Sequence, residues 1–157
     1  MKTKLLMIGK TRESFIETGY GLYKNRINHY LPFEDQTISG LKKNKSLSPS
    51  EIKTLEGELI LKSLKNQDTV ILLDEKGKSY NSTEFAGFIQ NKMNLGTRQL
   101  IFVIGGAYGF SPNVYQRADH QLSLSKMTFS HQIIRLIFME QFYRAMTILR
   151  SEPYHNR

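Results

Sequence analysis

A glycine-rich loop directly follows an apolar run in the second half of the chain. The run extends from Gln99 to Ile104, and Gly105, Gly106 and Gly109 come after it. Glycines at the end of a buried strand allow backbone N–H and C=O groups to approach a ligand closely. The spacing is not G-x-G-x-x-G and no Walker lysine follows, so a dinucleotide or a nucleoside triphosphate is poorly supported. A tight structural turn accounts for the same glycines.

A second segment places hydroxyl, amide and lysine side chains between a predicted strand and a predicted helix. It reads LSLSKMTFSH, from Leu122 to His131. These polar groups could hydrogen-bond the edge of an adenine ring. The alternative is that Thr128 or Ser130 only caps the helix that follows.

A third segment follows another apolar run and contains two adjacent carboxylates. It reads LDEKGK, from Leu73 to Lys78. At the end of its strand, Leu73 could offer its backbone to a ligand. Adjacent residues in a loop seldom converge on one substrate, so we expect Asp74 and Glu75 to be solvated charges.

The last predicted helix, from about Ser130 to Leu149, is apolar on most of its faces. A helix of this kind must be buried, and a subunit interface is one place for it. It carries two pairs at i,i+4 spacing, His131 with Arg135 and Glu140 with Arg144. We expect the Glu140–Arg144 pair to be structural, whereas Arg135 fits a structural role and a functional site equally well.

The residues after this helix read RSEPYHNR and combine aromatic, imidazole and guanidinium groups. Tyr154 could stack on a nucleic-acid base, and His155 could transfer a proton. Arg150 or Arg157 could hold a phosphate. A frayed terminus is the ordinary alternative.

The composition favours a polyanionic partner and excludes cysteine chemistry. The formal net charge is +8, which suits a nucleic acid, although a basic surface without such a partner is an equal alternative. There is no cysteine, so disulfides, thiolate catalysis and cysteine-ligated metals are excluded. The four histidines, at positions 29, 120, 131 and 155, show no metal-ligand spacing, so we expect no metal.

No segment reads as an export signal or a membrane span. The apolar run from Leu5 to Ile8 stops at Gly9 and is too short for either. We therefore expect a cytoplasmic protein without a membrane partner. Lys42, Lys43 and Lys45 lie in a predicted flexible loop, which could hold RNA phosphate or be merely solvated.

Strands and helices alternate along the chain, which predicts a single α/β domain over residues 1–157. Its sheet would be parallel with helices on both faces, and ligands would bind at the carboxyl ends of the strands. The predicted strands are Lys2–Gly9, Phe33–Ser39, Thr69–Leu73, Gln99–Ile104 and Gln121–Leu124; the predicted helices are Glu13 to about Asn28, one capped by Ser48 to about Lys65, one capped by Asn81 to about Asn94, a short one from Ser111, and about Ser130 to Leu149.

Taken in this order, five segments resemble the bacterial 23S ribosomal RNA pseudouridine N3-methyltransferases, a small family of the SPOUT class. Each segment is weak evidence alone, but five in order along a chain of this length are specific. They are LDEKGK (Leu73–Lys78), FVIGGAYG (Phe102–Gly109), LSLSKMTFSHQIIR (Leu122–Arg135), EQFYRA (Glu140–Ala145) and the pair Tyr154-His155.

The resemblance implies a SPOUT fold whose C-terminal part forms a trefoil knot, an exception to the general absence of knots. It also implies a homodimer that binds S-adenosylmethionine in the knot and acts on 23S ribosomal RNA in the large subunit or the ribosome. The C-terminal tail would reach a site shared between two subunits. The implied cofactor-binding residues are Leu73, Gly105, Leu124, Ser125, Lys126, Met127, Thr128 and Phe129.

The implied chemistry is methylation of N3 of a pseudouridine after removal of the N3 proton. His155 is the first choice for the base and His131 the second. Arg135 or Arg144 would stabilise negative charge on the carbonyl oxygens, and Tyr154 would position the target base.

Two other interpretations remain open at this point. A ribosome-assembly factor without catalysis would use the same basic surface, and a SPOUT methyltransferase for another RNA would have the same cofactor site. The chain also departs from the family in one place. A basic residue is expected directly after the Tyr-His pair, but Asn156 stands there and Arg157 follows.

Overall fold

We describe residues 1–41 and 47–155 from a computed structural model of the chain. The predicted lysine loop, with Lys42, Lys43 and Lys45, lies outside these residues, as do Asn156 and Arg157.

The described residues form a five-stranded sheet in which all paired strands are parallel. The strand order is β2-β1-β4-β3-β5, so the prediction of a parallel α/β sheet is confirmed. The strands are β1 (Lys2–Ile8), β2 (Phe33–Ile38), β3 (Thr69–Ser79), β4 (Gln99–Ile104) and β5 (His120–Ser123).

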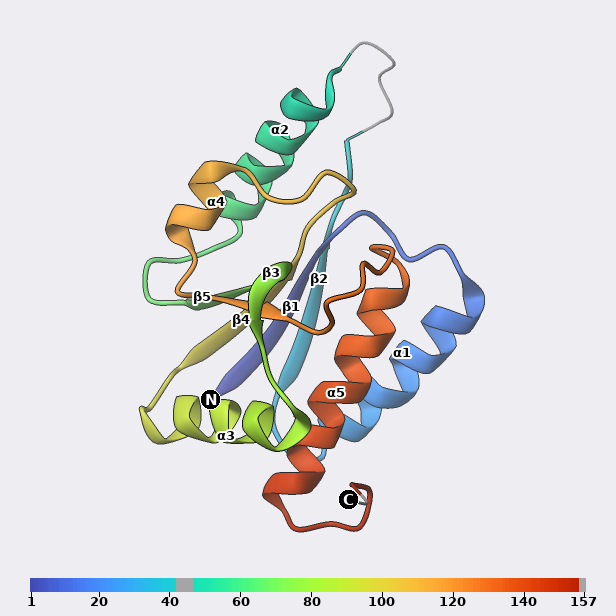
Figure 1. Cartoon of the computed structure of the whole chain (residues 1–157), viewed down its shortest axis with the longest axis vertical. Coiled ribbons are helices and arrows are strands. Elements are labelled where there is room, and N and C mark those ends of the chain that lie inside the picture. Colours follow the sequence, from blue (N-terminus) through green and yellow to red (C-terminus); the bar gives the residue numbers. More distant parts are fainter. Residues whose placement is uncertain (42–46, 156–157) are drawn as a thin grey trace.

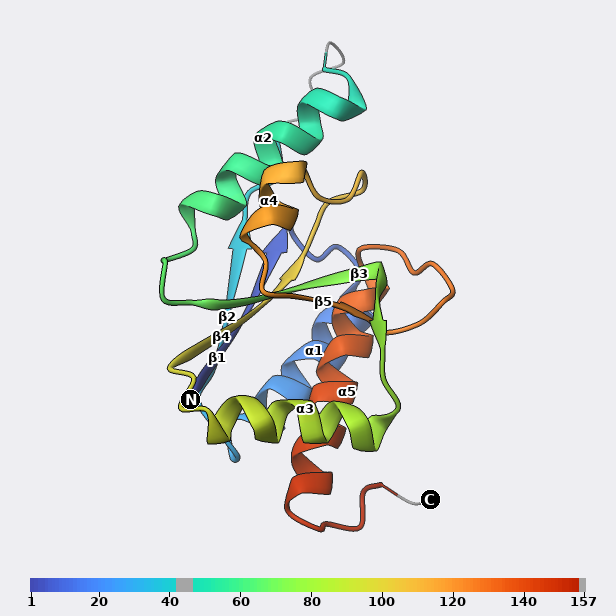
Figure 2. The same cartoon turned by 60° about the vertical axis from the view of Figure 1, so that its left-hand side comes forward.

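Helices cover both faces of the sheet (Figures 1 and 2). One face carries α1 (Ser14–Ile27), α3 (Ser82–Asn94) and α5 (Ile133–Leu149), and the other carries α2 (Pro49–Lys62) and α4 (Pro112–Arg117). Successive strand residues point to opposite faces, and both sets are apolar. In β1, Leu5 packs in the core under the first group of helices and Leu6 in the core under the second.

The two predicted capping boxes are confirmed. Ser48 Oγ accepts the backbone N–H of Glu51 at 3.2 Å, and Asn81 Oδ1 accepts that of Glu84 at 2.8 Å. Each glutamate accepts the N–H of its cap residue in return. These boxes satisfy backbone donors that the first turns of α2 and α3 would otherwise leave unpaired.

The prediction that β3 ends at Leu73 is wrong, because the strand continues to Ser79. The segment expected to be a loop pairs with β5. Leu122 stands opposite both Leu73 and Lys78, with a shift in register between these two positions. Pairing with β5, which is distant in sequence, therefore extends a strand whose local composition suggests a loop.

The last helix begins at Ile133 rather than at Ser130. The residues before it are held by the loop that follows β1. The Gln132 side chain accepts the N–H of Arg12 at 2.9 Å and donates to the carbonyl of Lys10 at 3.1 Å. Gln132 is the N-cap residue, and the Ser130 hydroxyl accepts the N–H of Ile133, the first residue of the helix, at 3.2 Å.

Gly77 lies where β3 crosses the backbone of β5 at close range. A Cβ at this position would stand 2.5 Å from the backbone nitrogen of Leu122 and 2.6 Å from the carbonyl carbon of Gln121. Real Cβ atoms essentially never approach other atoms so closely, and paired backbone cannot move aside cheaply. Only glycine therefore permits this crossing.

We expect Gly77→Ala to lower the free energy of unfolding by roughly 3 kcal/mol or more, because its methyl group must displace backbone. Chemical denaturation monitored by circular dichroism would measure the change. Gly87→Ala is the matched control, since no atom lies within 4 Å of its Cβ on the exposed face of α3. Gly87→Ala should raise the free energy of unfolding by about 0.5–1 kcal/mol, because alanine has the higher helix propensity. Equal stability of the two variants would contradict the close crossing.

Candidate active site

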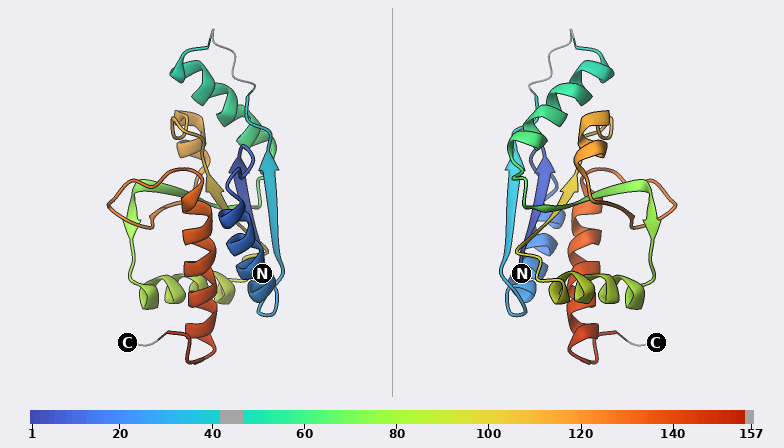
Figure 3. Two further views of the ribbon diagram at one scale, coloured as in Figure 1. Left: turned by 90° about the vertical axis from the view of Figure 1, so that its right-hand side faces the viewer. Right: turned by 90° about the vertical axis from the view of Figure 1, so that its left-hand side faces the viewer.

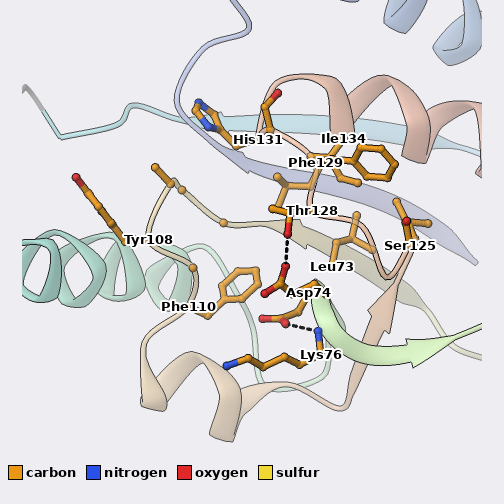
Figure 4. Close-up of a pocket in the computed structure, with 18 of the residues that line it drawn as sticks. Leu73, Asp74, Lys76, Tyr108, Phe110, Ser125, Thr128, Phe129, His131 and Ile134 are labelled. Carbon is orange, nitrogen blue, oxygen red and sulfur yellow. Dashed lines mark hydrogen bonds between the residues drawn. The ribbon is translucent and has the colours of Figure 1, made fainter.

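A cavity of about 600 Å³ lies where the predicted ligand segments meet, at the carboxyl ends of β4 and β5 and beside the middle of β3 (Figure 4). This volume suits a small-molecule ligand. Among the residues implied to bind a cofactor, Lys126 does not line the cavity. The other seven do: Leu73, Gly105, Leu124, Ser125, Met127, Thr128 and Phe129.

Two side-chain hydrogen bonds tie the elements around the cavity together. Thr128 Oγ1 donates to Glu75 Oε2 at 2.8 Å, which joins the segment before α5 to β3. The hydroxyl of Tyr115 on α4 donates to Asp74 Oδ2. Burial and the neighbouring Asp74 raise the pKa of Tyr115, so this hydroxyl keeps its proton. Asp74 is therefore a half-buried acceptor and not simply solvated, whereas Glu75 is exposed as expected and also accepts a hydrogen bond from Thr128.

A side chain at position 105 would be in tight contact with its surroundings. A Cβ there would stand 3.0 Å from Cε1 of Phe110, whose ring is buried behind the glycine loop. Phe110 and Tyr115 both line the cavity, and the sequence analysis missed both. Neither residue belongs to a periodic apolar pattern in the sequence. Both reach the cavity only because the chain folds back through α4.

Large apolar side chains stand exposed around the cavity. Met127 is 76% exposed, Tyr108 49% and Phe129 37% (Figure 4 labels the two aromatic residues). Apolar groups gathered at one cavity mark a surface that a ligand or a partner covers.

A buried carboxylate supports the glycine loop from behind. Glu56 on α2 is 8% exposed, and its Oε2 has no hydrogen-bond partner in the part of the chain that the structure describes. A Cβ on Gly106 would stand 2.2 Å from this oxygen, so the carboxylate occupies the space that a side chain would need. Burial raises the pKa of Glu56 because it disfavours the charged form.

His131 and Arg135 lie at the same end of α5 but differ in exposure. His131 is exposed and lines the cavity. Its pKa is lowered by burial of part of the ring and by the charges of Arg135 and Arg12. Arg135 is fully buried, and it donates to the carbonyls of His131 and Ile8 and to the Thr11 hydroxyl, at 2.9, 2.7 and 2.9 Å. Arg135 therefore holds the start of α5 to the end of β1.

The other predicted catalytic residues, Arg144, Tyr154 and His155, lie on the second half of α5 and on the tail that follows it. Tyr154 donates a hydrogen bond to Glu140 Oε1 at 3.1 Å, and the same carboxylate forms the predicted ion pair with Arg144. Arg144 Nη1 lies 3.5 Å from His155 Nδ1, and its guanidinium lies 4.9 Å from the Tyr154 ring centre. The tail is therefore packed through Tyr154, and the alternative of a frayed terminus does not hold for the described residues up to His155.

The length of α5 separates these residues from the cavity. The helix has 17 residues and is therefore roughly 25 Å long. Figure 3 shows the segment before α5 and the tail after it at opposite ends of the helix. Within one chain, the tail residues and the cavity thus form two separate groups.

Two kinds of feature are absent from residues 1–41 and 47–155. No cluster of three or more histidine, aspartate or glutamate side chains in this part could hold a metal ion. Among the described helices, none is both long and apolar enough to cross a membrane.

The fold and the cavity agree with the family to which the chain belongs. The family model described as "Predicted SPOUT methyltransferase" matches residues 1–155. The chain is therefore a member of the SPOUT methyltransferases, and its class of activity is methyl transfer.

Individual relatives narrow this class. A protein of Christiangramia forsetii named "Ribosomal RNA large subunit methyltransferase H" is 54% identical over 157 residues, which is 100% of both chains. Proteins with the same name from Parabacteroides distasonis and Flavobacterium johnsoniae are 53% and 49% identical, covering 99% and 100% of each chain. The resemblance to ribosomal RNA methyltransferases is thus confirmed.

We expect Glu56→Gln to raise the free energy of unfolding at pH 7 and to change it little at acidic pH. The raised pKa means that the folded protein binds a proton that the unfolded chain releases, so wild-type stability falls as pH rises above the unfolded value. The amide has the same shape and no charge. Thermal unfolding measured across pH would test this, and a benefit of the same size at every pH would contradict the buried-carboxyl account.

Proposed function

We propose that this chain methylates N3 of a pseudouridine in 23S ribosomal RNA of the large subunit or the ribosome, with S-adenosylmethionine as methyl donor. The main support for this proposal is the cavity between the glycine loop and the segment before α5, in a chain that belongs to the SPOUT methyltransferase family. The names of its relatives favour large-subunit ribosomal RNA over another RNA. The net charge of +8 suits such a substrate.

The residues that line the cavity fit this cofactor. Leu73, Leu124 and Phe129 offer apolar surface to a flat ring, while Ser125 and the backbone of Gly105 offer hydrogen-bonding groups. When bound, S-adenosylmethionine supplies a methyl group on a sulfonium, which is already an activated leaving group. The protein's tasks are then to orient the acceptor and to remove its proton.

A trefoil knot is part of this proposal. The tight crossing at Gly77 and the pairing of β5 with two sections of β3 support a chain that threads through itself next to the cavity. In the proposed knot, the walls of the cofactor site are the crossing segments themselves. Residues 1–157 would form this one domain.

We further propose a homodimer in which the tail of one subunit completes the cavity of the other. The position of the cavity at the start of α5 and of the tail after its end supports this arrangement (Figure 3). Isologous packing of α5 would bring each tail to the partner's cavity. It would also cover Leu136, Ile137 and Ile148, which stay partly exposed on a largely apolar helix.

In the proposed mechanism His155 takes the N3 proton and Tyr154 positions the base. A guanidinium only donates hydrogen bonds, so its contact with His155 makes Nδ1 the acceptor and leaves the proton on Nε2. A substrate that draws Arg144 toward its carbonyl oxygens would free Nδ1 to accept the proton. Arg144 would then stabilise the negative charge left on the base. Arg135 would act only by holding α5 in place.

Calorimetric titration with S-adenosylhomocysteine would test the cofactor site directly. We expect saturable binding by the wild type and binding weakened roughly a hundredfold or more by Gly105→Val, whose side chain must displace Phe110 or fill the cavity. Gly87→Val is the matched control, because a Cβ there meets no atom within 4 Å. If the folded wild type bound no S-adenosylhomocysteine, the proposed cofactor site would be wrong.

Mixing two inactive variants would test the shared site. We expect His155→Ala to lower turnover roughly a hundredfold. After unfolding and refolding together, His155→Ala and Gly105→Val should regain about a quarter of wild-type activity, because half of the dimers are mixed and each has one intact site. Methylation of large ribosomal subunits with a radiolabelled donor would measure this. If proven mixed dimers regained no activity, the proposal of a shared site would be wrong, because the cavity and the tail of the same chain would then form the site.

A further inference from the structure

Arg26 is a cationic side chain of the tail cluster that the sequence analysis did not select. We define the tail cluster as the tyrosines Tyr23, Tyr143 and Tyr154 with Arg26 and Arg144. The Arg26 guanidinium carbon lies 5.7 Å from the ring centre of Tyr23 and 5.5 Å from that of Tyr143. The Tyr143 ring in turn meets Tyr154 edge-on at 4.8 Å.

The charges of the neighbouring residues set Arg26 apart. Arg144 is paired with Glu140, and Lys24, on the same helix as Arg26, is paired with Asp35. Glu152, at the start of the tail, accepts a hydrogen bond from the Tyr30 hydroxyl. Among the residues that the structure describes, Arg26 has no carboxylate within 4 Å and its guanidinium donates no hydrogen bond.

Two tyrosine rings hold the guanidinium, while its N–H groups have no acceptor among residues 1–41 and 47–155. Contacts to the aromatic rings orient the planar group without using its donors. Side-by-side N–H groups of a guanidinium match two oxygens of one phosphate. Arg26 is partly exposed, so an anion from outside the chain can reach it.

We propose that Arg26 binds a backbone phosphate of the RNA beside the target nucleotide. This inference rests on the proposed function, because it assigns a substrate contact to the half of the site formed by the tail. Tyr154 and His155 would meet the base while Arg26 holds the adjoining backbone. The tyrosines link both parts, since Tyr23 and Tyr154 have their hydroxyl oxygens 3.3 Å apart.

Binding to purified large ribosomal subunits, measured at several salt concentrations, tests the proposal without requiring turnover. Arg26→Gln removes the charge and keeps most of the stem that packs on the tyrosines. We expect roughly tenfold weaker binding and a logarithmic salt slope about one unit shallower, as for the loss of one phosphate contact. Arg26→Lys should recover part of the affinity and the salt slope. Arg98→Ala is the control, since it removes an exposed arginine outside the tail cluster.

Methylation kinetics and cofactor titration separate the other outcomes. We expect Arg26→Gln to raise KM and leave kcat and S-adenosylhomocysteine affinity unchanged. A fall in kcat at unchanged KM would overturn the proposal, because Arg26 would then act on the reacting base. Unchanged subunit binding and salt slope would overturn it as well. A wild type that binds subunits through Arg26 but neither binds the cofactor nor methylates would refute the proposed function alone.

Discussion

The close crossing of β3 and β5 at Gly77 is the constraint on which the rest of the site depends. Because the two backbones approach closely there, β5 can pair with two sections of β3. The part of β3 after Leu73 therefore lies next to the segment that follows β5. The hydrogen bond between Thr128 and Glu75 then joins the two walls. A side chain at position 77 would separate the same backbones that form the cavity, which links fold stability directly to the ligand site.

The second organising feature is the helix α5, whose two ends carry different chemistry. Its first turn is fixed by Arg135, which binds the carbonyl at the end of β1 and orients the segment beside the cavity. Glu140 at its middle and Arg144 in its second half bind the tail residues Tyr154 and His155. A rigid helix of this length keeps the cavity and the tail of one chain apart. In the proposed dimer, the tail of each subunit reaches the cavity of the other.

Three arginines show how surroundings decide function. Arg135 is buried with its donors on carbonyls and a hydroxyl, so its charge supports structure. Arg144 shares a carboxylate with Tyr154 and stands next to His155, which suits a group that changes partners when substrate binds. Arg26 rests on aromatic rings with its donors unused, which suits an external anion. Residue type alone could not separate these roles.

The sequence by itself determined the parallel α/β sheet, the capping boxes and the loops that form the cavity, because apolar runs, caps and glycines act within a few residues. It also carried the family resemblance in five short segments. Only the tertiary structure decided that β3 continues to Ser79, that Arg135 is buried, that the Phe110 ring stands against Gly105, and that the tail lies apart from its own cavity. These features arise from contacts between residues distant in sequence, for which local patterns contain no signal.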